Sequence, residues 1–153
     1  MLRKGSQADV QFMRAMLAHA YHWHVAGLDT EIPLARYVDH WGRPGDLAVI
    51  AADGPNPVGA AWCRRFTEAA PGYGFVDEET PELTIAVVPS KRKHGVGQEL
   101  LDALLARAAT EKIAALSLSV EKGSPAVAFY ERNGFTEVAE HGKAVTMLRR
   151  LES

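Results

Sequence analysis

The sequence predicts an α+β domain in which a mixed, mostly antiparallel sheet is flanked by helices as the middle of three α/β layers. Strand-forming segments at Leu47–Ala52 and Val58–Phe66 stand on either side of DGPNP, whose turn-forming residues suit an antiparallel hairpin connection. Further along, an apolar run, an amphipathic segment and an alternating segment indicate strand, crossover helix and strand. That order is typical of a parallel strand pair with a right-handed connection.

The first half of the chain begins with a short edge strand at Leu2–Gly5. Apolar residues then recur at helical spacing from Val10 to Tyr21, which predicts a first helix that begins near Ser6. A short helix is expected over Pro33–Trp41, and WGRPGD separates it from the hairpin.

The middle of the chain contains a long stretch without a period, Thr67–Pro81. Loops of this length in compact domains are often functional, so we expect a substrate loop here. The continuous apolar run Leu83–Val88 follows, and such runs are typical of a strand covered on both faces.

The second half continues the alternation of helices and strands. An apolar stripe predicts a helix over Val96–Lys112, and alternation predicts a strand over Leu116–Val120. Ser124 and Pro125 suit the N-cap and first position of another helix, which Asn133–Gly134 would end through a left-handed C-cap. Two short strands complete the domain, at Phe135–Val138 and Val145–Leu148.

Length and composition indicate an ordinary globular protein. The 153 residues suit a single domain over 1–153, and a hydrophobic fraction of 47% with 24% charged residues excludes disordered and fibrous classes. The net charge of -2 provides no general attraction to nucleic acid, so no nucleic-acid partner is expected.

Cysteine content and hydropathy bear on the compartment. Cys63 stands alone, which excludes an intramolecular disulfide and a four-cysteine zinc site, and we expect it to be a core residue. The N-terminus lacks the apolar region of a signal peptide, and no uncharged apolar stretch approaches the roughly 20 residues of a membrane span. We therefore expect a cytoplasmic protein with no membrane partner.

The stretch VVPSKRKHGVGQELL places two glycines between a strand end and a helix start. Unpaired N–H groups and the positive end of the helix dipole make such a position an anion site. A P-loop would need Lys and then Ser or Thr after Gly97, and a dinucleotide fingerprint would need a third glycine in place of Leu100. Neither of these phosphate motifs is present.

Two segments carry a family resemblance. Val87, Pro89, Arg92, Gly95 and Gly97 fill the pattern V-x-P-x-x-R-x-x-G-x-G, which resembles the pyrophosphate motif of the GNAT superfamily of acetyl-CoA-dependent N-acetyltransferases. Downstream, SPAVAFYERNGF is similar to that family's N-P-A-x-x-L-Y-E-x-x-G-F segment, with serine at 124 and phenylalanine at 129 as departures. The resemblance covers nearly the whole chain and implies a GNAT-like acyl-CoA N-acyltransferase fold.

The resemblance implies acetyl-CoA as co-substrate, with no metal. It places the pyrophosphate on the backbone near the glycines and the pantetheine arm between the strands at 86–88 and 116–120. A backbone N–H near Val87 would steady the oxyanion as an amine attacks the acetyl carbonyl directly. The implied cofactor-binding residues are Ala86, Val87, Val88, Arg92, Lys93, His94, Gly95, Val96, Gly97, Ser124 and Tyr130.

Two catalytic residues are expected. Tyr130 is the candidate general acid, because a phenol with a pKa of about 10 is protonated at neutral pH and can donate to the CoA thiolate. Glu82, at the start of the central strand, is the candidate base, although its spacing is displaced by one residue from the family's glutamate, which would point it to the other face. Glu68, a histidine of the first helix or ordered water are the alternatives.

The acceptor amine is not identified by the sequence. HAYHWH holds His19, His22 and His24 but lacks the glutamate of a zinc motif. Its residues Tyr21, His22, Trp23 and His24 suit either the lining of an acceptor pocket or an ordinary helix end. Asp77–Glu79 would attract a cationic amine or simply be solvated. An acyl-CoA-binding regulatory module without turnover is the alternative function, and homodimers are common in the family.

Overall fold

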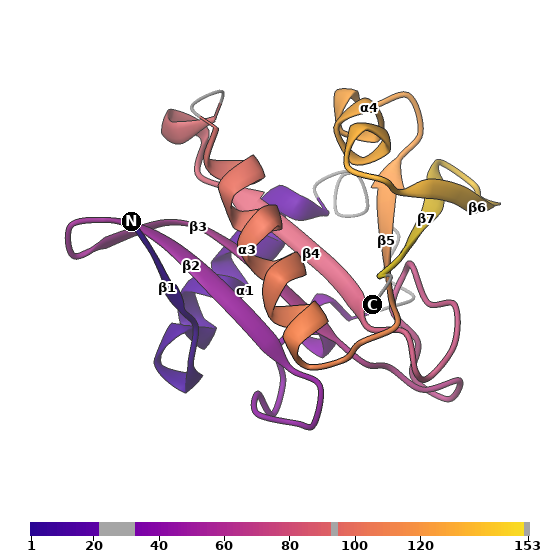
Figure 1. Ribbon diagram of the computed structural model, residues 1–153, viewed down its shortest axis with the longest axis horizontal. Coiled ribbons are helices and arrows are strands. Elements are labelled where there is room, and N and C mark those ends of the chain that lie inside the picture. The colour runs from indigo at the N-terminus through magenta and orange to yellow at the C-terminus, as the bar shows by residue number, and fades with distance from the viewer. Residues whose placement is uncertain (22–32, 93–94, 152–153) are drawn as a thin grey trace.

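The computed structural model describes residues 1–21, 33–92 and 95–151. Within them, one sheet has the strand order β1-β2-β3-β4-β5-β7-β6 (Figure 1). Every neighbouring pair is antiparallel except β4 and β5, which are parallel. The strands are β1 (Leu2–Lys4), β2 (Leu47–Asp53), β3 (Asn56–Arg64), β4 (Glu82–Val87), β5 (Ala115–Glu121), β6 (Thr136–His141) and β7 (Ala144–Arg150).

The parallel pair is joined at one end only. β4 and β5 share the single register pair Glu82↔Ser117, next to which the Ser117 N–H donates to the Pro81 carbonyl at 3.0 Å. β4 is paired with β3 along its whole length, from Arg64↔Glu82 to Gly59↔Val87. In Figure 1 the two central strands lie together near their starts and diverge toward their ends. The sheet is therefore splayed in its middle.

Helices cover both faces of the sheet. α1 (Val10–Ala20) follows a 3-10 turn, η1 (Gln7–Asp9), at which Ser6 and Asp9 form a capping box. α1 buries Met13, Met16 and Leu17 in the core of one face, and α3 (Val96–Thr110) buries Leu100, Leu101, Leu104 and Ala108 in the core of the other. α4 (Pro125–Arg132) lies by β5, beyond the splay.

The predicted order of strands and helices is confirmed, with differences at the ends of elements. The helix expected over Pro33–Trp41 is only a 3-10 turn, η2 (Leu34–Tyr37), because the chain beyond it turns through left-handed φ angles of 55° at His40 and 112° at Gly42. Another 3-10 turn, η3 (Pro89–Lys91), follows β4. No helix within the described residues is long and apolar enough to cross a membrane.

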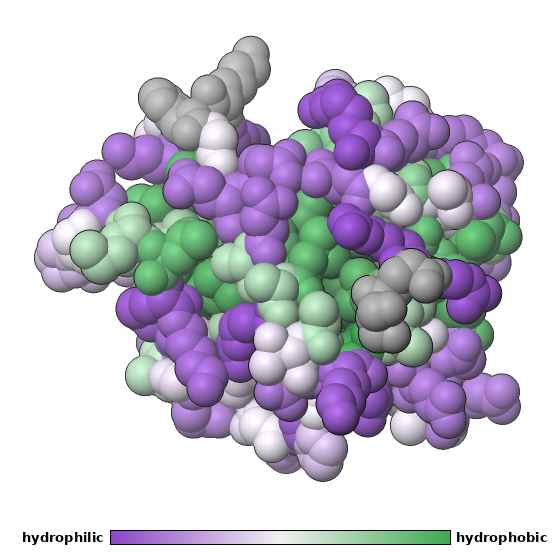
Figure 2. All heavy atoms as spheres, in the orientation of Figure 1, coloured by the Kyte–Doolittle hydropathy of each residue, from purple (hydrophilic) through white to green (hydrophobic). Residues whose placement is uncertain are grey.

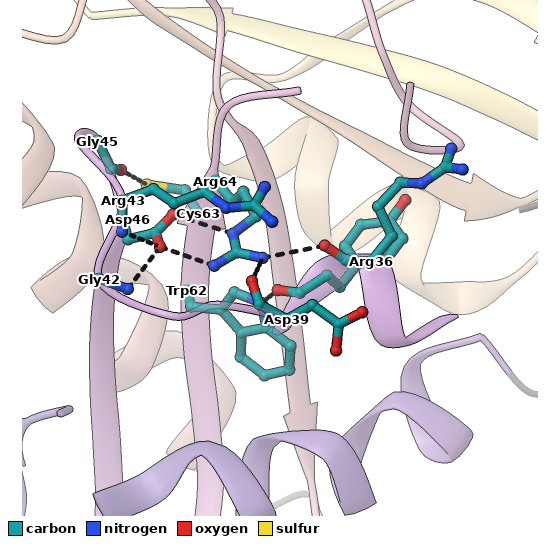
Figure 3. Close-up of polar contacts among 10 residues, drawn as sticks. Arg36, Asp39, Gly42, Arg43, Gly45, Asp46, Trp62, Cys63 and Arg64 are labelled. Carbon is teal, nitrogen blue, oxygen red and sulfur yellow. Dashed lines mark hydrogen bonds and ion pairs between the residues drawn. The ribbon is translucent and has the colours of Figure 1, made fainter. Parts of the chain in front are cut away.

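A buried arginine fastens η2 and the loop after it to β3 (Figure 3). Arg64 is fully buried and forms an ion pair with Asp46 at 2.8 Å. Its guanidinium also donates to the carbonyls of Arg36, at 3.1 Å, and Asp39, at 2.6 Å. Beside it, the Trp62 indole N–H donates to the Tyr37 carbonyl at 3.1 Å. These bonds fix the backbone that carries the Tyr37 side chain.

Removal of Asp46 tests this attachment. Asp46→Ala leaves the Arg64 charge buried without its partner, so we expect the free energy of unfolding to fall by about 3–5 kcal/mol in urea denaturation. Glu140→Ala, in the exposed pair with Lys122, is the control and changes it by less than about 1 kcal/mol. Equal, small losses in both variants would contradict the assigned role of Arg64.

Candidate functional site

A cavity of about 490 Å³ opens where β4 and β5 diverge. Residues of β4, β5, α4, the start of α3 and the end of α1 line it. In Figure 2 apolar side chains form a strip between the α3 side and the α4 side, with hydrophilic residues around it. The cavity is thus an apolar cleft with a polar rim, the usual form of a small-molecule site.

The β4 wall presents backbone hydrogen-bonding groups to the cavity. The Val88 N–H donates to the Val58 carbonyl at 2.8 Å, so the residues of even number on β4 direct their N–H and C=O groups to β3. Ile85 and Val87 therefore direct theirs toward β5, but no residue of β5 pairs with them, and the Val87 carbonyl accepts from Arg92 Nε instead. A linear polar chain lying in the cleft can pair with these groups.

The start of α3 forms the basic end of the cavity. Gly95 is the N-cap with a left-handed φ of 79°, a conformation that favours glycine. Gly97 lines the cavity, and a Cβ at this position would meet no atom within 4 Å, so its backbone is open to a ligand. Arg92 also lines the cavity, with Nε donating to the Val87 carbonyl at 3.1 Å and Nη2 lying 3.3 Å from His19 Nδ1.

The opposite wall is α4. Ser124 caps this helix by accepting the Ala126 N–H at 3.1 Å. The cap therefore does not need the asparagine that the family pattern has at this position. Tyr130 lines the cavity, and its ring packs edge-on against Phe129 and Phe135 at centroid distances of 5.2 and 5.6 Å. Burial raises the pKa of the Tyr130 hydroxyl well above its ordinary value. The phenol is accordingly protonated, as a proton donor must be.

Glu82 lies at the closed end of the splay and is 1% exposed. Its Oε2 accepts hydrogen bonds from the hydroxyls of Tyr37 and Tyr21, the latter at 3.3 Å, and its Oε1 accepts the Gly74 N–H at 2.9 Å. Burial raises its pKa to about 7, and these hydrogen bonds limit the rise. A carboxyl with this pKa exchanges protons near neutral pH, which suits a general base.

A glycine turn at residues 72–74 packs into the closed end of the splay. A Cβ on Gly72 would lie 2.4 Å from Glu82 Oε1, and one on Gly74 would lie 2.6 Å from the backbone carbon of Leu118 in β5. Between them, the Tyr73 N–H donates to the Tyr37 hydroxyl at 2.7 Å. The turn fits between β4 and β5 only because both flanking residues lack side chains.

The cavity brings together part of the expected cofactor set. Ala86, Val87, Arg92, Gly97, Ser124 and Tyr130 line it. Val88 and Gly95 are not among its lining residues, and Val96 lines a second cavity of about 230 Å³ with Met1, Leu2 and Glu99. Lys93 and His94 lie outside the described residues.

The other candidates fall in different places. Glu82 sits behind the cavity wall, His19 lines the cavity, and Glu68 is exposed in the loop before β4. His22, Trp23 and His24 lie outside the described residues. Cys63 is buried in the core as predicted, and burial raises the pKa of its thiol to about 12.

Sequence reasoning missed two residues of the site, Thr84 and Tyr37, and predicted Tyr21 only as part of an acceptor pocket, not as a partner of Glu82. Tyr21 and Thr84 line the cavity with hydroxyls 3.1 Å apart, and Tyr37 reaches Glu82 from η2. In their own segments, Thr84 is an ordinary strand residue and Tyr37 an ordinary residue of a short helix. One sequence feature could have indicated this part of the site, namely the GYG triplet in the loop over Thr67–Pro81, because closely spaced glycines permit a close approach of two backbones.

Comparisons with known proteins identify the family and the fold. The profile of the Acetyltransferase (GNAT) family matches residues 11–135, and the chain belongs to that family. A search of curated proteins found no match.

Three solved structures share the fold. They are a ribosomal-protein-alanine N-acetyltransferase from Brucella melitensis (22% identity, 99% of each chain covered, TM-score 0.69), the PaiA N-acetyltransferase from Thermoplasma acidophilum in complex with coenzyme A (18%, 98% of each chain, 0.67), and an aminoglycoside 6'-N-acetyltransferase complexed with coenzyme A (16%, 100% of this chain and 98% of that one, 0.67).

The buried carboxyl makes stability depend on pH. Glu82 has a pKa of about 7 in the folded protein and about 4.5 when exposed, so between these values the folded state holds a proton that the unfolded state has lost. This extra proton stabilises the folded state fully below pH 4.5. The free energy of unfolding then falls by about 3 kcal/mol as the pH rises through about 7. Glu82→Gln should flatten the fall in urea denaturation across this range.

Glu79→Gln, in the exposed part of the loop, is the matched control and should retain the wild-type pH dependence. A Glu82→Gln profile as steep as the wild-type one would show that the carboxyl titrates normally.

Proposed function

We propose that this protein transfers the acetyl group of acetyl-CoA to an amine, which attacks the thioester directly in the cavity between β4 and β5. The observation that carries the proposal is the single-point pairing of these strands, Glu82↔Ser117, which leaves the backbone of Ile85 and Val87 facing a cleft. The cleft leads to the glycine-capped start of α3.

The proposed cofactor position follows from the polarity of the cleft. The pyrophosphate would lie on the first N–H groups of α3, where Gly97 leaves the backbone open, with Arg92 beside it and Lys93 and His94 as further proposed contacts. The amide groups of the pantetheine arm would pair with the β4 edge at Ile85, because the Val87 carbonyl already accepts from Arg92 Nε. Of the residues expected here, Val88 is the weakest, because its N–H already donates to Val58.

Three groups around the cleft would carry out the transfer. The Val87 N–H would stabilise the oxyanion that forms when the amine nitrogen bonds to the acetyl carbon. As the carbon–sulfur bond breaks, the Tyr130 hydroxyl would give its proton to the CoA sulfur. Glu82 would take the proton that an alkylammonium acceptor must lose before it attacks.

The acyl-CoA-binding module without turnover remains the alternative. Retention of a protonated tyrosine in the cavity and of a buried carboxyl with a pKa of about 7 favours the enzyme. The acceptor class differs among the structural relatives, which include a ribosomal-protein-alanine N-acetyltransferase and an aminoglycoside 6'-N-acetyltransferase. A cytoplasmic location and a homodimer stay predictions.

Cofactor binding is tested at Gly97. Titration calorimetry should give micromolar acetyl-CoA affinity for the wild type, and Gly97→Glu should weaken it at least 100-fold by obstructing and repelling the pyrophosphate. Gly97→Ala, whose methyl group has open space, should bind within fivefold of the wild type, and Gly97→Gln separates obstruction from charge. Folded wild type that does not bind acetyl-CoA would refute the proposal.

The acid role is tested at Tyr130. Tyr130→Phe keeps the ring contacts with Phe129 and Phe135 and removes only the hydroxyl, so kcat for CoA release to an accepted amine should fall on the order of 100-fold with acetyl-CoA affinity little changed. Phe129→Leu, the neighbouring residue, is the control and should keep kcat within about threefold. Equal kcat in Tyr130→Phe and the wild type would remove Tyr130 from the mechanism.

A further inference from the structure

The proposed base does not itself reach the cavity. Glu82 is 1% exposed and is not among the residues that line the cleft. Tyr21 and Thr84 are among them, and the hydroxyl of Tyr21 also donates to the carboxylate. A proton that leaves an amine in the cleft must therefore cross one more group before it arrives at Glu82.

Tyr21 is placed to be that group. It is the C-cap of α1, held by its N–H bond to the Leu17 carbonyl at 2.9 Å, and its side chain is 2% exposed. Its hydroxyl lies 3.3 Å from Glu82 Oε2 and 3.1 Å from Thr84 Oγ1. The same side chain thus forms part of the cavity wall and contacts the carboxylate.

The second tyrosine on Glu82 has a different place. Tyr37 donates to the same Oε2 atom but is not among the lining residues, and its own hydroxyl accepts the Tyr73 N–H. Within the described residues, Tyr21 is accordingly the one partner of Glu82 that also faces the cavity. Tyr37 and the Gly74 N–H orient the carboxylate from the far side.

We propose that Tyr21 relays the proton of the acceptor ammonium to Glu82, and this proposal rests on the proposed function. One N–H bond of the ammonium breaks and its proton bonds to Tyr21 Oη, while the Tyr21 hydroxyl proton bonds to Glu82 Oε2. Tyr21 is a neutral phenol before and after the step, and Glu82 becomes a neutral carboxylic acid.

The remaining protons balance within the same site. The neutral amine attacks the acetyl carbon, and its second proton, lost as the amide forms, replaces the one that Tyr130 gives to the CoA sulfur. After the products leave, Glu82 returns its proton through Tyr21 to solvent. The relay needs no tyrosinate, which fits the burial that raises the pKa of Tyr21 well above its ordinary value.

The test compares two acceptors that differ in the need for the relay. Methylamine is a strong base and arrives as an ammonium, whereas hydroxylamine is a weak base that is already neutral at pH 7.5. CoA release from saturating acetyl-CoA is measured with each, corrected for the uncatalysed reaction. Wild type, Tyr21→Phe, Glu82→Gln and Tyr37→Phe are compared, and acetyl-CoA affinity is measured for each by calorimetry.

The relay predicts an acceptor-dependent loss. Tyr21→Phe and Glu82→Gln should each lose on the order of 100-fold in kcat with methylamine and less than tenfold with hydroxylamine, with acetyl-CoA affinity within threefold. Tyr37→Phe removes a hydrogen bond that lowers the pKa of Glu82. In a profile of kcat against pH, the acid limb of this variant should therefore move to higher pH, while the plateau value of kcat falls less than tenfold.

Each other outcome identifies what fails. Tyr21→Phe turnover of methylamine within tenfold of the wild type overturns the relay and leaves the proposed function standing. Equal losses in Tyr21→Phe and Tyr37→Phe also overturn it, because both hydroxyls would then only support the carboxylate. Wild type that binds acetyl-CoA but transfers to no amine overturns the proposed function, and the relay with it.

Discussion

The organisation of this protein depends on the parallel pair β4 and β5 being joined at one end only. At Glu82↔Ser117 the two strands complete a continuous sheet, and beyond that point each retains only its outer neighbour. Backbone N–H and C=O groups in a protein interior need partners. The splay therefore presents backbone groups without a strand partner along an apolar cleft, an arrangement that suits an extended molecule with amide groups of its own.

The closed end of the splay combines stability with chemistry. A carboxyl is buried there without a cation bonded to it among the described residues, and two tyrosine hydroxyls and a backbone amide hold it in place. One of those tyrosines depends on the Arg64 network, which fixes the backbone around η2, and the amide depends on the glycine turn. The contacts that keep the carboxyl oriented are thus supplied by segments remote from the cofactor motif.

The sequence was sufficient for the order of elements and for the glycines at the start of α3, because both are local patterns. Strand alternation, helical spacing and the two glycines each lie within about twenty residues of chain. The surroundings of Glu82 could not be predicted in this way, since Tyr21 and Tyr37 come from 61 and 45 residues away. The direction of each N–H on β4 depends on its register with β3, so no local pattern could separate Val87, which faces the cleft, from Val88, which does not.

The most direct measurement of the central claim is a titration of acetyl-CoA into isotopically labelled protein, followed through backbone amide NMR signals. If the cofactor lies along the open edge of β4, the amides of Ile85 and Val87 shift strongly and become protected from hydrogen exchange. Those of Ala86 and Val88, which pair with β3, shift much less. Strong changes without this alternation, or changes confined to another part of the molecule, would contradict the account.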